Sequence, residues 1–187
     1  MAERKQQLIG YAHMVFGWGW TPLPIKIATK HPYLPKWQLT TKEDALRRFN
    51  REVSKGAADG ISILTGATSG IVVLDIDDVP YWITLLEGKE LEPTFVVQTA
   101  GEGLHYYFQY DERMGNLINS NRIWGQKIDF RSNSGVIVFA GNITPDGRSY
   151  NVAYPDNINE LERPPLARMP IWLYDWILSY QQSIHRR

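Results

Sequence analysis

The stretch "IVVLDIDD", residues 71–78, runs from four apolar residues into three carboxylates, Asp75, Asp77 and Asp78. The apolar run predicts a buried β-strand, because it is short and rich in β-branched residues. Three like charges crowded at the end of such a strand repel one another, which costs stability unless a cation neutralises them or water screens them. The stretch therefore predicts either a metal site or a solvated turn.

The composition is that of an ordinary globular protein. Of 187 residues, 43% are apolar and 21% charged, so we expect one compact domain with a sizeable core. A net charge of zero argues against a strongly basic protein that coats nucleic acid, although a local basic groove remains compatible with it. The absence of cysteine excludes disulfides, thiolate catalysis and cysteine-based metal sites. Without an apolar run of roughly 18 residues or a signal-peptide pattern, we expect a soluble, cytoplasmic protein.

Four segments are predicted to be helical. Residues 40–54 begin with Thr40 and Glu43 at capping-box spacing, and residues 78–88 place Pro80 where a first helical turn accepts it. Residues 3–16 carry an apolar face made of Leu8, Tyr11, Ala12 and Val15. The C-terminal segment carries one made of Ile171, Trp172, Trp176, Ile177 and Tyr180. Residues 17–37 mix Gly, Pro and Trp, which predicts an ordered loop held by its tryptophans.

Short apolar runs broken by glycine predict the strands. These runs are residues 60–64, 70–76, 94–99, 103–110, 127–130 and 135–140. The fold class expected from this order is α+β, with a mostly antiparallel sheet flanked by helices. We divide the single domain, residues 1–187, into an N-terminal helical and loop part (1–58), a sheet core (59–165) and a C-terminal helix (166–187).

Asp75 and Asp77 are two residues apart in a strand, so both side chains leave the same face. Two carboxylates near one point are the hard oxygen ligands that Mg²⁺ or Mn²⁺ prefers. Asp78 falls on the opposite face or in the turn, and we expect it to cap the following helix. Asp129 interrupts a second apolar strand and shares its face with Arg131. Each aspartate alone is equally compatible with a strand-end turn, but two interrupted strands together favour a three-carboxylate site for two divalent ions.

His105 lies near the start of the strand that follows the turn Gly101-Glu102-Gly103. A lone histidine in a strand is commonly a structural residue. Here, however, Gly103 permits close approach of the backbone, and an imidazole N–H can donate to a phosphate oxygen. Beside the carboxylates, His105 would therefore contact a nucleotide. No P-loop lysine motif occurs in the chain.

Three elements thus follow one another: hydrophobic-Asp-x-Asp, Gly-x-His at a strand start, and hydrophobic-Asp in a later strand. Their order and spacing resemble the primase-polymerase (Prim-Pol) domain of the archaeo-eukaryotic primase superfamily, found in bifunctional DNA primase/polymerases of plasmids, phages and mobile elements. The resemblance covers most of the chain. It rests on "GWGWTPLPIKIATKHPYLPKW", "ISILTGATSGIVVLDID", "GLHYYF", and "KIDFRSNSGVIVFAG" with "PDGRSY". It implies an RRM-like sheet, the catalytic core of that superfamily.

The resemblance also implies roles for individual residues. Asp75, Asp77 and Asp129 would hold two divalent ions, Mg²⁺ or Mn²⁺, for two-metal phosphoryl transfer in DNA synthesis. His105 and Gly103 would contact the triphosphate of the incoming nucleotide. Arg131 and Lys30 would bind its phosphates by charge-assisted hydrogen bonds. The implied partners are single-stranded DNA, nucleoside triphosphates and, in the same or another chain, a helicase region.

Two departures from the family pattern concern the nucleotide contacts. The family usually has Ser-Gly-Gly before the histidine, whereas this chain has Gly101-Glu102-Gly103. After the last strand, Ala140-Gly141-Asn142 replaces a Pro-Pro-Ser type run.

Two other functions fit parts of the sequence. A haloacid-dehalogenase-like phosphatase would use "VVLDIDDV" with the first Asp as nucleophile and the second as general acid/base, but it would need its motif near the N-terminus and parallel βα units. A non-catalytic module would bind nucleic acid through an aromatic, basic loop such as residues 17–37 and would tolerate loss of Asp75 or Asp77. De novo priming, the choice between ribo- and deoxynucleotides, and oligomeric state are not encoded in these motifs.

Overall fold

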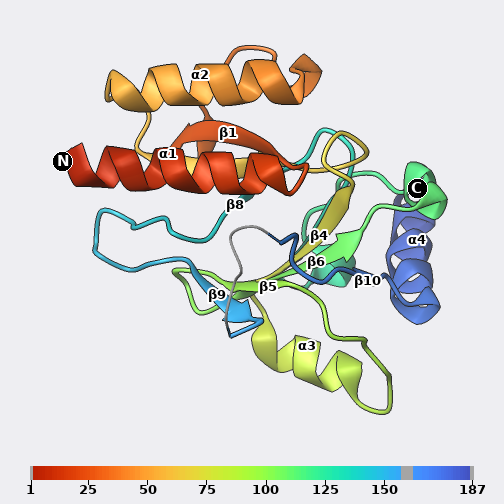
Figure 1. Cartoon of the computed structure of the whole chain (residues 1–187). Helices are drawn as coiled ribbons and strands as arrows, with labels where there is room; N and C mark the ends of the chain where they lie inside the picture. The colour runs from red at the N-terminus through yellow and green to blue at the C-terminus, as the bar shows by residue number, and fades with distance from the viewer. Residues whose placement is uncertain (1, 157–161, 186–187) are drawn as a thin grey trace.

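Two β-sheets pack against each other, with helices on their outer sides (Figure 1). The computed structural model describes residues 2–156 and 162–185. The helices are α1 (Ala2–Gly17), α2 (Lys42–Ser54), α3 (Val79–Leu86) and α4 (Ile171–His185), with short 3₁₀ turns η1 (Trp37–Leu39), η2 (Glu112–Asn116) and η3 (Ile123–Gly125). The strands are β1 (Thr21–Lys26), β2 (His31–Pro32), β3 (Gly60–Leu64), β4 (Ile71–Ile76), β5 (Val96–Gln98), β6 (Leu104–Gln109), β7 (Ile128–Arg131), β8 (Val136–Val138), β9 (Asn151–Tyr154) and β10 (Ala167–Arg168).

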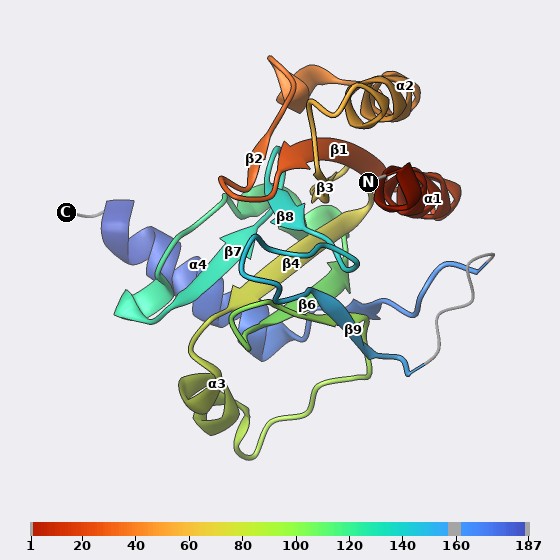
Figure 2. The same cartoon turned by 90° about the vertical axis from the view of Figure 1, so that its left-hand side faces the viewer.

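The expected α+β class with antiparallel strands is confirmed, but the strands form two sheets where the sequence predicted one. The first sheet has the order β2-β1-β3-β8, and the second has the order β7-β4-β6-β5-β9. Every pairing is antiparallel except that of β10 with β6. The strand of the "IVVLDIDD" stretch, β4, lies inside the second sheet, between β7 and β6 (Figure 2).

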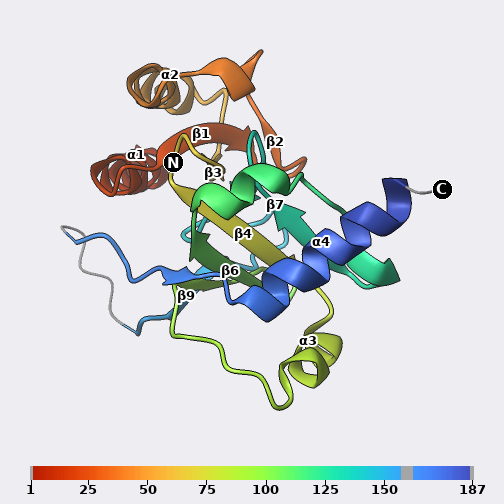
Figure 3. The same ribbon diagram turned by 90° about the vertical axis from the view of Figure 1, so that its right-hand side faces the viewer.

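The two faces of β4 enter different cores, which explains why its apolar run is continuous. Ile71 and Val73 belong to a cluster between the sheets that also holds Trp18, Trp20 and Tyr107. The alternate residues of β4, Val72, Leu74 and Ile76, face the other way and belong to a second cluster, which contains Trp82 of α3 and Leu173 and Ile177 of α4. Helix α4 crosses this outer face of the sheet (Figure 3).

The predicted N-terminal helices are confirmed, with one shift. Leu8, Ala12 and Val15 of α1 are buried as expected. The N-cap of α2 is Thr41, not Thr40, because it is the Thr41 hydroxyl that accepts a hydrogen bond from the Asp44 N–H. Asp78 caps α3 by accepting from the Tyr81 N–H. The helix cap expected at Asp78 is thereby confirmed.

Residues 17–37 were wrongly predicted to lack a strand. Trp18 and Trp20 are buried and hold the segment, as expected, but β1 lies within it and pairs with β3. Pro24 points its carbonyl away from β3, since this oxygen accepts from the Tyr33 N–H on the other side. Pro22 shares that orientation because it lies two residues away. Both prolines therefore lack their N–H on the side away from β3, where the short strand β2 pairs only with Ile25 and Lys26, so no hydrogen bond to β3 is lost.

The C-terminal helix packs largely by its predicted face, with Ile177 buried and Trp172, Trp176 and Tyr180 partly buried against the second cluster. Its buried side chains are Leu173, Ile177 and Gln181, whereas Ile171 at its start is exposed. Residues 186–187 of the predicted helix lie outside the described residues. Strands β9 and β10 were not predicted. Within the described ranges, no helix is long and apolar enough to cross a membrane.

Candidate active site

Three of the predicted site residues lie side by side on neighbouring strands. In the register of the second sheet, Asp75 of β4 is directly opposite Asp129 of β7 on one side and His105 of β6 on the other. Residues directly opposite in an antiparallel pair point to the same face. Asp129, Asp75 and His105 therefore form a polar row across three strands, and we call it the carboxylate row.

The carboxylate row follows the apolar part of the same sheet face. Two residues away along each strand, and on the same face, Val73 and Tyr107 are fully buried beneath the first sheet. Asp77 follows two residues after Asp75, beyond the last residue of β4. The row thus begins where the core between the sheets ends, and this is why charged residues interrupt otherwise apolar strands.

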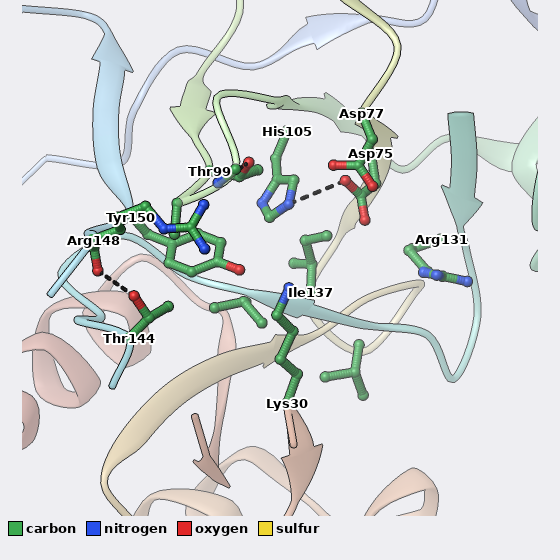
Figure 4. A pocket seen from close by; sticks show the side chains of 14 residues that line it. Lys30, Asp75, Asp77, Thr99, His105, Arg131, Ile137, Thr144, Arg148 and Tyr150 are labelled. Atoms are coloured by element: carbon green, nitrogen blue, oxygen red, sulfur yellow. Dashed lines mark hydrogen bonds and ion pairs between the residues drawn. The ribbon is translucent and has the colours of Figure 1, made fainter. Parts of the chain in front are cut away.

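A cavity of about 330 Å³ opens beside the row (Figure 4). Asp75, Asp77, His105 and Arg131 line it, and Val136–Val138 of β8 form an apolar wall. Lys30 reaches it from the turn between β1 and β2, where the residue has a left-handed φ of 58°. Asp129 and Gly103 do not line the cavity. Five of the seven predicted site residues, Lys30 among them, thus line one cavity, and the other two, Asp129 and Gly103, lie outside its lining.

His105 and Asp75 form a buried pair. The distance between His105 Nε2 and Asp75 Oδ1 is 3.3 Å, and the side chains are 4% and 22% exposed, so only the carboxylate retains appreciable solvent contact. Among the described residues, Nδ1 of His105 is buried without a hydrogen-bond partner. The imidazole is therefore oriented by Asp75 and keeps one ring nitrogen unpaired beside the cavity.

The two cavity-lining aspartates have opposite electrostatic surroundings. Burial disfavours the charged form of Asp75, but His105, Arg131 and Lys30 outweigh this and lower its pKa. For Asp77, burial and then the charge of Asp75 raise the pKa. The neighbouring Tyr150 side chain, and then the charges of Asp75 and Asp77, raise the pKa of Lys30. The cations of the cavity thus outweigh the cost of burial at Asp75 but not at Asp77.

Asp129 is engaged by protein donors. Its Oδ1 accepts from the Arg122 backbone N–H at 2.8 Å, and its Oδ2 accepts from Arg131 Nη2 at 2.6 Å. In the part of the chain that the structure describes, no three histidine or acidic side chains converge into a metal-binding group. The donor chemistry nevertheless fits hard divalent cations, since the row and Asp77 supply carboxylate oxygens on one face and their mutual repulsion is what a cation would relieve.

Gly103 lies where the start of β6 closely approaches the end of β4, in line with the close backbone approach expected at this glycine. A Cβ at this position would lie 2.5 Å from the Ile76 carbonyl oxygen and 2.9 Å from Asp77 Oδ1. The connection before β6 is closed by the Thr99 N–H, which donates to the Gly103 carbonyl at 2.8 Å, and by the Thr99 hydroxyl, which accepts from the Gly101 and Gly103 N–H groups. Gly103 thereby allows β6 to start beside Asp77.

Sequence reasoning missed the cavity wall formed by Thr144, Arg148 and Tyr150. These residues belong to a hairpin-like loop in which the Thr144 N–H donates to the Arg148 carbonyl and the Gly147 N–H to the Thr144 carbonyl. Arg148 forms an ion pair with Asp146 at 2.7 Å. The turn signal Pro145-Asp146-Gly147 marked this loop, but nothing local indicated what it faces.

Asn142 occupies one of the positions that depart from the family pattern, and its role is structural. Its side-chain oxygen accepts from the Ile61 N–H, and its amide donates to the Ile61 and Phe139 carbonyls. This fully buried amide fixes the end of β8 to β3 and leaves no group free to contact a nucleotide.

Comparison with known families gives one match. Residues 12–172 match the family described as bifunctional DNA primase/polymerase, N-terminal (Prim-Pol). The matched range includes the carboxylate row, the loop of Arg148 and the first residues of α4. No curated protein matches the chain.

Proposed function

The chain belongs to the bifunctional DNA primase/polymerase N-terminal (Prim-Pol) family, and on this premise we propose that it is a template-dependent nucleotidyltransferase that joins nucleoside triphosphates on single-stranded DNA. The observation that carries the proposal is the register of β7, β4 and β6, which places Asp129, Asp75 and His105 in one row. The cavity next to this row contains Lys30 and Arg131, as a triphosphate pocket requires. The two-sheet arrangement, with β4 inside its sheet, would be this family's catalytic core.

Asp75, Asp77 and Asp129 would hold two divalent cations, Mg²⁺ or Mn²⁺. Such a pair of ions, when bound, activates the primer 3′-hydroxyl and stabilises charge on the pyrophosphate leaving group. For Asp129 to take part, its Oδ2 must exchange the Arg131 guanidinium for a cation, and Arg131 is then free to contact a phosphate. At Asp77, a nearby cation would offset the burial and the charge of Asp75, which raise the pKa of this carboxyl.

The remaining cavity residues would bind the incoming nucleotide. Lys30 and Arg148 approach from opposite loops and supply positive charge for the β- and γ-phosphates. His105, oriented by Asp75, would turn its unpaired Nδ1 toward a phosphate oxygen. Gly103 would act indirectly, by letting β6 bring His105 close to the end of β4.

The phosphatase alternative fits the structure less well. Both neighbours of β4 run antiparallel to it, whereas that class needs parallel βα units around its Asp-x-Asp strand. The non-catalytic alternative predicts that Asp75 and Asp77 are dispensable. A helicase region as partner and the division of the chain at residues 58 and 165 stay predictions.

A gel assay of labelled nucleotide incorporation tests the proposal. The protein is incubated with Mg²⁺ or Mn²⁺ on primed and unprimed single-stranded DNA, beside an Asp75→Ala/Asp77→Ala variant and a sample with EDTA. We expect template-dependent extension that disappears in both controls. Extension that survives the double substitution, or hydrolysis of a phosphatase substrate in place of extension, would refute the proposal. Product from the unprimed template would add priming.

A further inference from the structure

An exposed tryptophan is held rigidly in the loop that leads into β7. Trp124 in η3 is 43% exposed, although tryptophan has the largest of the apolar side chains. Its indole N–H donates to the Trp176 carbonyl at 3.2 Å, and its ring stands edge-to-face against Tyr180 with 5.6 Å between the centroids. Arg122 and Trp124 both have a φ of 52°. Residues with side chains rarely adopt this left-handed conformation, and where they do the strain commonly accompanies a binding function.

The same loop is hydrogen-bonded to the carboxylate row. The Arg122 N–H donates to Asp129 Oδ1 at 2.8 Å, and Arg131 Nη1 donates to Asn121 Oδ1 at 2.7 Å. Arg122 and Lys127 are exposed on either side of η3. The loop is therefore joined to the row at Arg122, and it carries an exposed aromatic ring and two exposed cations, as do surfaces that bind a nucleic-acid strand. We call Asn121, Arg122, Trp124 and Lys127 the β7 platform.

The strand order places the β7 platform at one end of the carboxylate row, next to Arg131, and the cavity residues beyond His105 at the other end. The sheet runs β7-β4-β6-β5-β9, so β7 lies on one side of β4. Thr99, Arg148 and Tyr150 lie on the other side, past His105 (Figure 4). In phosphoryl transfer the attacking and leaving oxygens lie roughly in line through the phosphorus. A pyrophosphate that leaves toward Arg148 therefore requires a 3′-hydroxyl that arrives from the side of β7.

We propose that the β7 platform holds the 3′ end of the primer strand, an inference that rests on the proposed polymerase function. Trp124 packs against the terminal primer nucleotide, and Arg122 and Lys127 contact phosphates of the same strand. Asn121 links this surface to the carboxylate row through Arg131, so that primer and incoming nucleotide are positioned by adjoining parts of one site.

Binding of labelled DNA, measured by fluorescence anisotropy on the full chain, tests this assignment. Primed DNA and the same template without primer are compared for the wild type and Trp124→Ala. We expect the Kd for primed DNA to rise about tenfold, within the range for loss of one aromatic–nucleotide stack, while the Kd for the unprimed strand changes less than about twofold. Arg122→Gln and Lys127→Gln should each lower the slope of log Kd against log salt concentration by about one for primed DNA.

Two further variants guard against effects of misfolding and of general surface change. Trp124→Leu keeps an apolar contact for Tyr180 and should show the same loss of affinity, while circular dichroism shows that it is folded at the temperature of the binding assay. Arg47→Gln on α2, whose side chain is 79% exposed, and Ile83→Ala on α3, 58% exposed, are matched surface changes that should leave both Kd values unchanged.

The outcomes separate this proposal from the proposed function. If the wild type extends primers and Trp124→Ala binds primed DNA as tightly as the wild type, the β7 platform is not the primer site, although the polymerase function stands. An equal loss on primed and unprimed DNA would also overturn the primer assignment, because it would mean that the platform holds the template. If the wild type neither binds nor extends primed DNA, both proposals fail together.

Discussion

Replacement of Gly103 by alanine tests whether the close approach of β6 to β4 builds the site. The φ of Gly103 lies outside the left-handed region, so alanine is allowed by the backbone and only space opposes it. The new Cβ would lie 2.5 Å from the Ile76 carbonyl oxygen, a backbone atom that cannot rotate away, and 2.9 Å from Asp77 Oδ1. The start of β6 must therefore move away from the end of β4.

Gly101 provides a matched control in the same connection. A Cβ there would meet only the Thr99 hydroxyl, at 3.8 Å, which is ordinary contact. Both substitutions lower the conformational entropy of the unfolded chain, which stabilises the folded state by a similar amount, so this stabilisation cancels when the two variants are compared. Overpacking of a tight contact costs about 1–3 kcal/mol. Gly103→Ala should thus be less stable than Gly101→Ala by about 2 kcal/mol, or about 4–8 °C in melting temperature for a domain of this size.

The same displacement should reduce catalysis. His105 follows two residues after Gly103, and its Nε2 lies 3.3 Å from Asp75 Oδ1. A shift of about 1 Å in a site residue costs on the order of 10²-fold in rate. Thermal unfolding by circular dichroism and nucleotide incorporation well below the melting temperature measure the two effects. Equal melting temperatures for Gly101→Ala and Gly103→Ala, or an unchanged incorporation rate for Gly103→Ala, would refute the reasoning.

Two further predictions concern charged residues. Arg148→Gln should raise the KM for the nucleotide about tenfold, because a charge-assisted contact to phosphate is lost; steady-state kinetics that show no change would remove Arg148 from the nucleotide site. Hydrogen bonds from Arg113 lower the pKa of Asp111 below its ordinary value of 3.8. Because the folded-state pKa is the lower one, this stabilisation is present above pH 3.8 and is lost as the pH falls through the lowered pKa. The difference in unfolding free energy between wild type and Arg113→Gln, measured by urea titration, should therefore shrink below that pH. The part that remains is the contribution of the hydrogen bond from Arg113 to the Met169 carbonyl. A difference that is the same at pH 7 and pH 3 would contradict this.

The carboxylate row was predictable because strand periodicity is a local property. Asp75 and Asp77 had to share a face, and Asp129 and His105 each interrupted an apolar strand at a comparable position. What periodicity could not supply was the pairing of these strands. The register that aligns Asp129, Asp75 and His105 depends on the turns and cores of the whole sheet.

The parts that sequence reasoning missed depend on tertiary context. Pro22 and Pro24 argue against a strand unless their missing N–H groups are known to point away from the main partner strand, as they do in β1. Arg148 and Tyr150 lie in a loop whose local signals specify a turn but not the cavity beside it. The bonds of Asp129 to Arg122 and Arg131 likewise join residues whose contact no spacing rule implies.

The rate of single-nucleotide incorporation in Asp77→Asn and Asp78→Asn tests the central claim most directly. The two aspartates are adjacent, but Asp77 lines the cavity whereas Asp78 caps α3, and asparagine is an equally good cap. We predict that Asp77→Asn lowers the rate by about 10³-fold or more, the scale expected when a transition-state charge contact is lost, while Asp78→Asn stays within about twofold of the wild type. Equal rates for the two variants would contradict the assignment of the carboxylates as the catalytic centre of a nucleotidyltransferase.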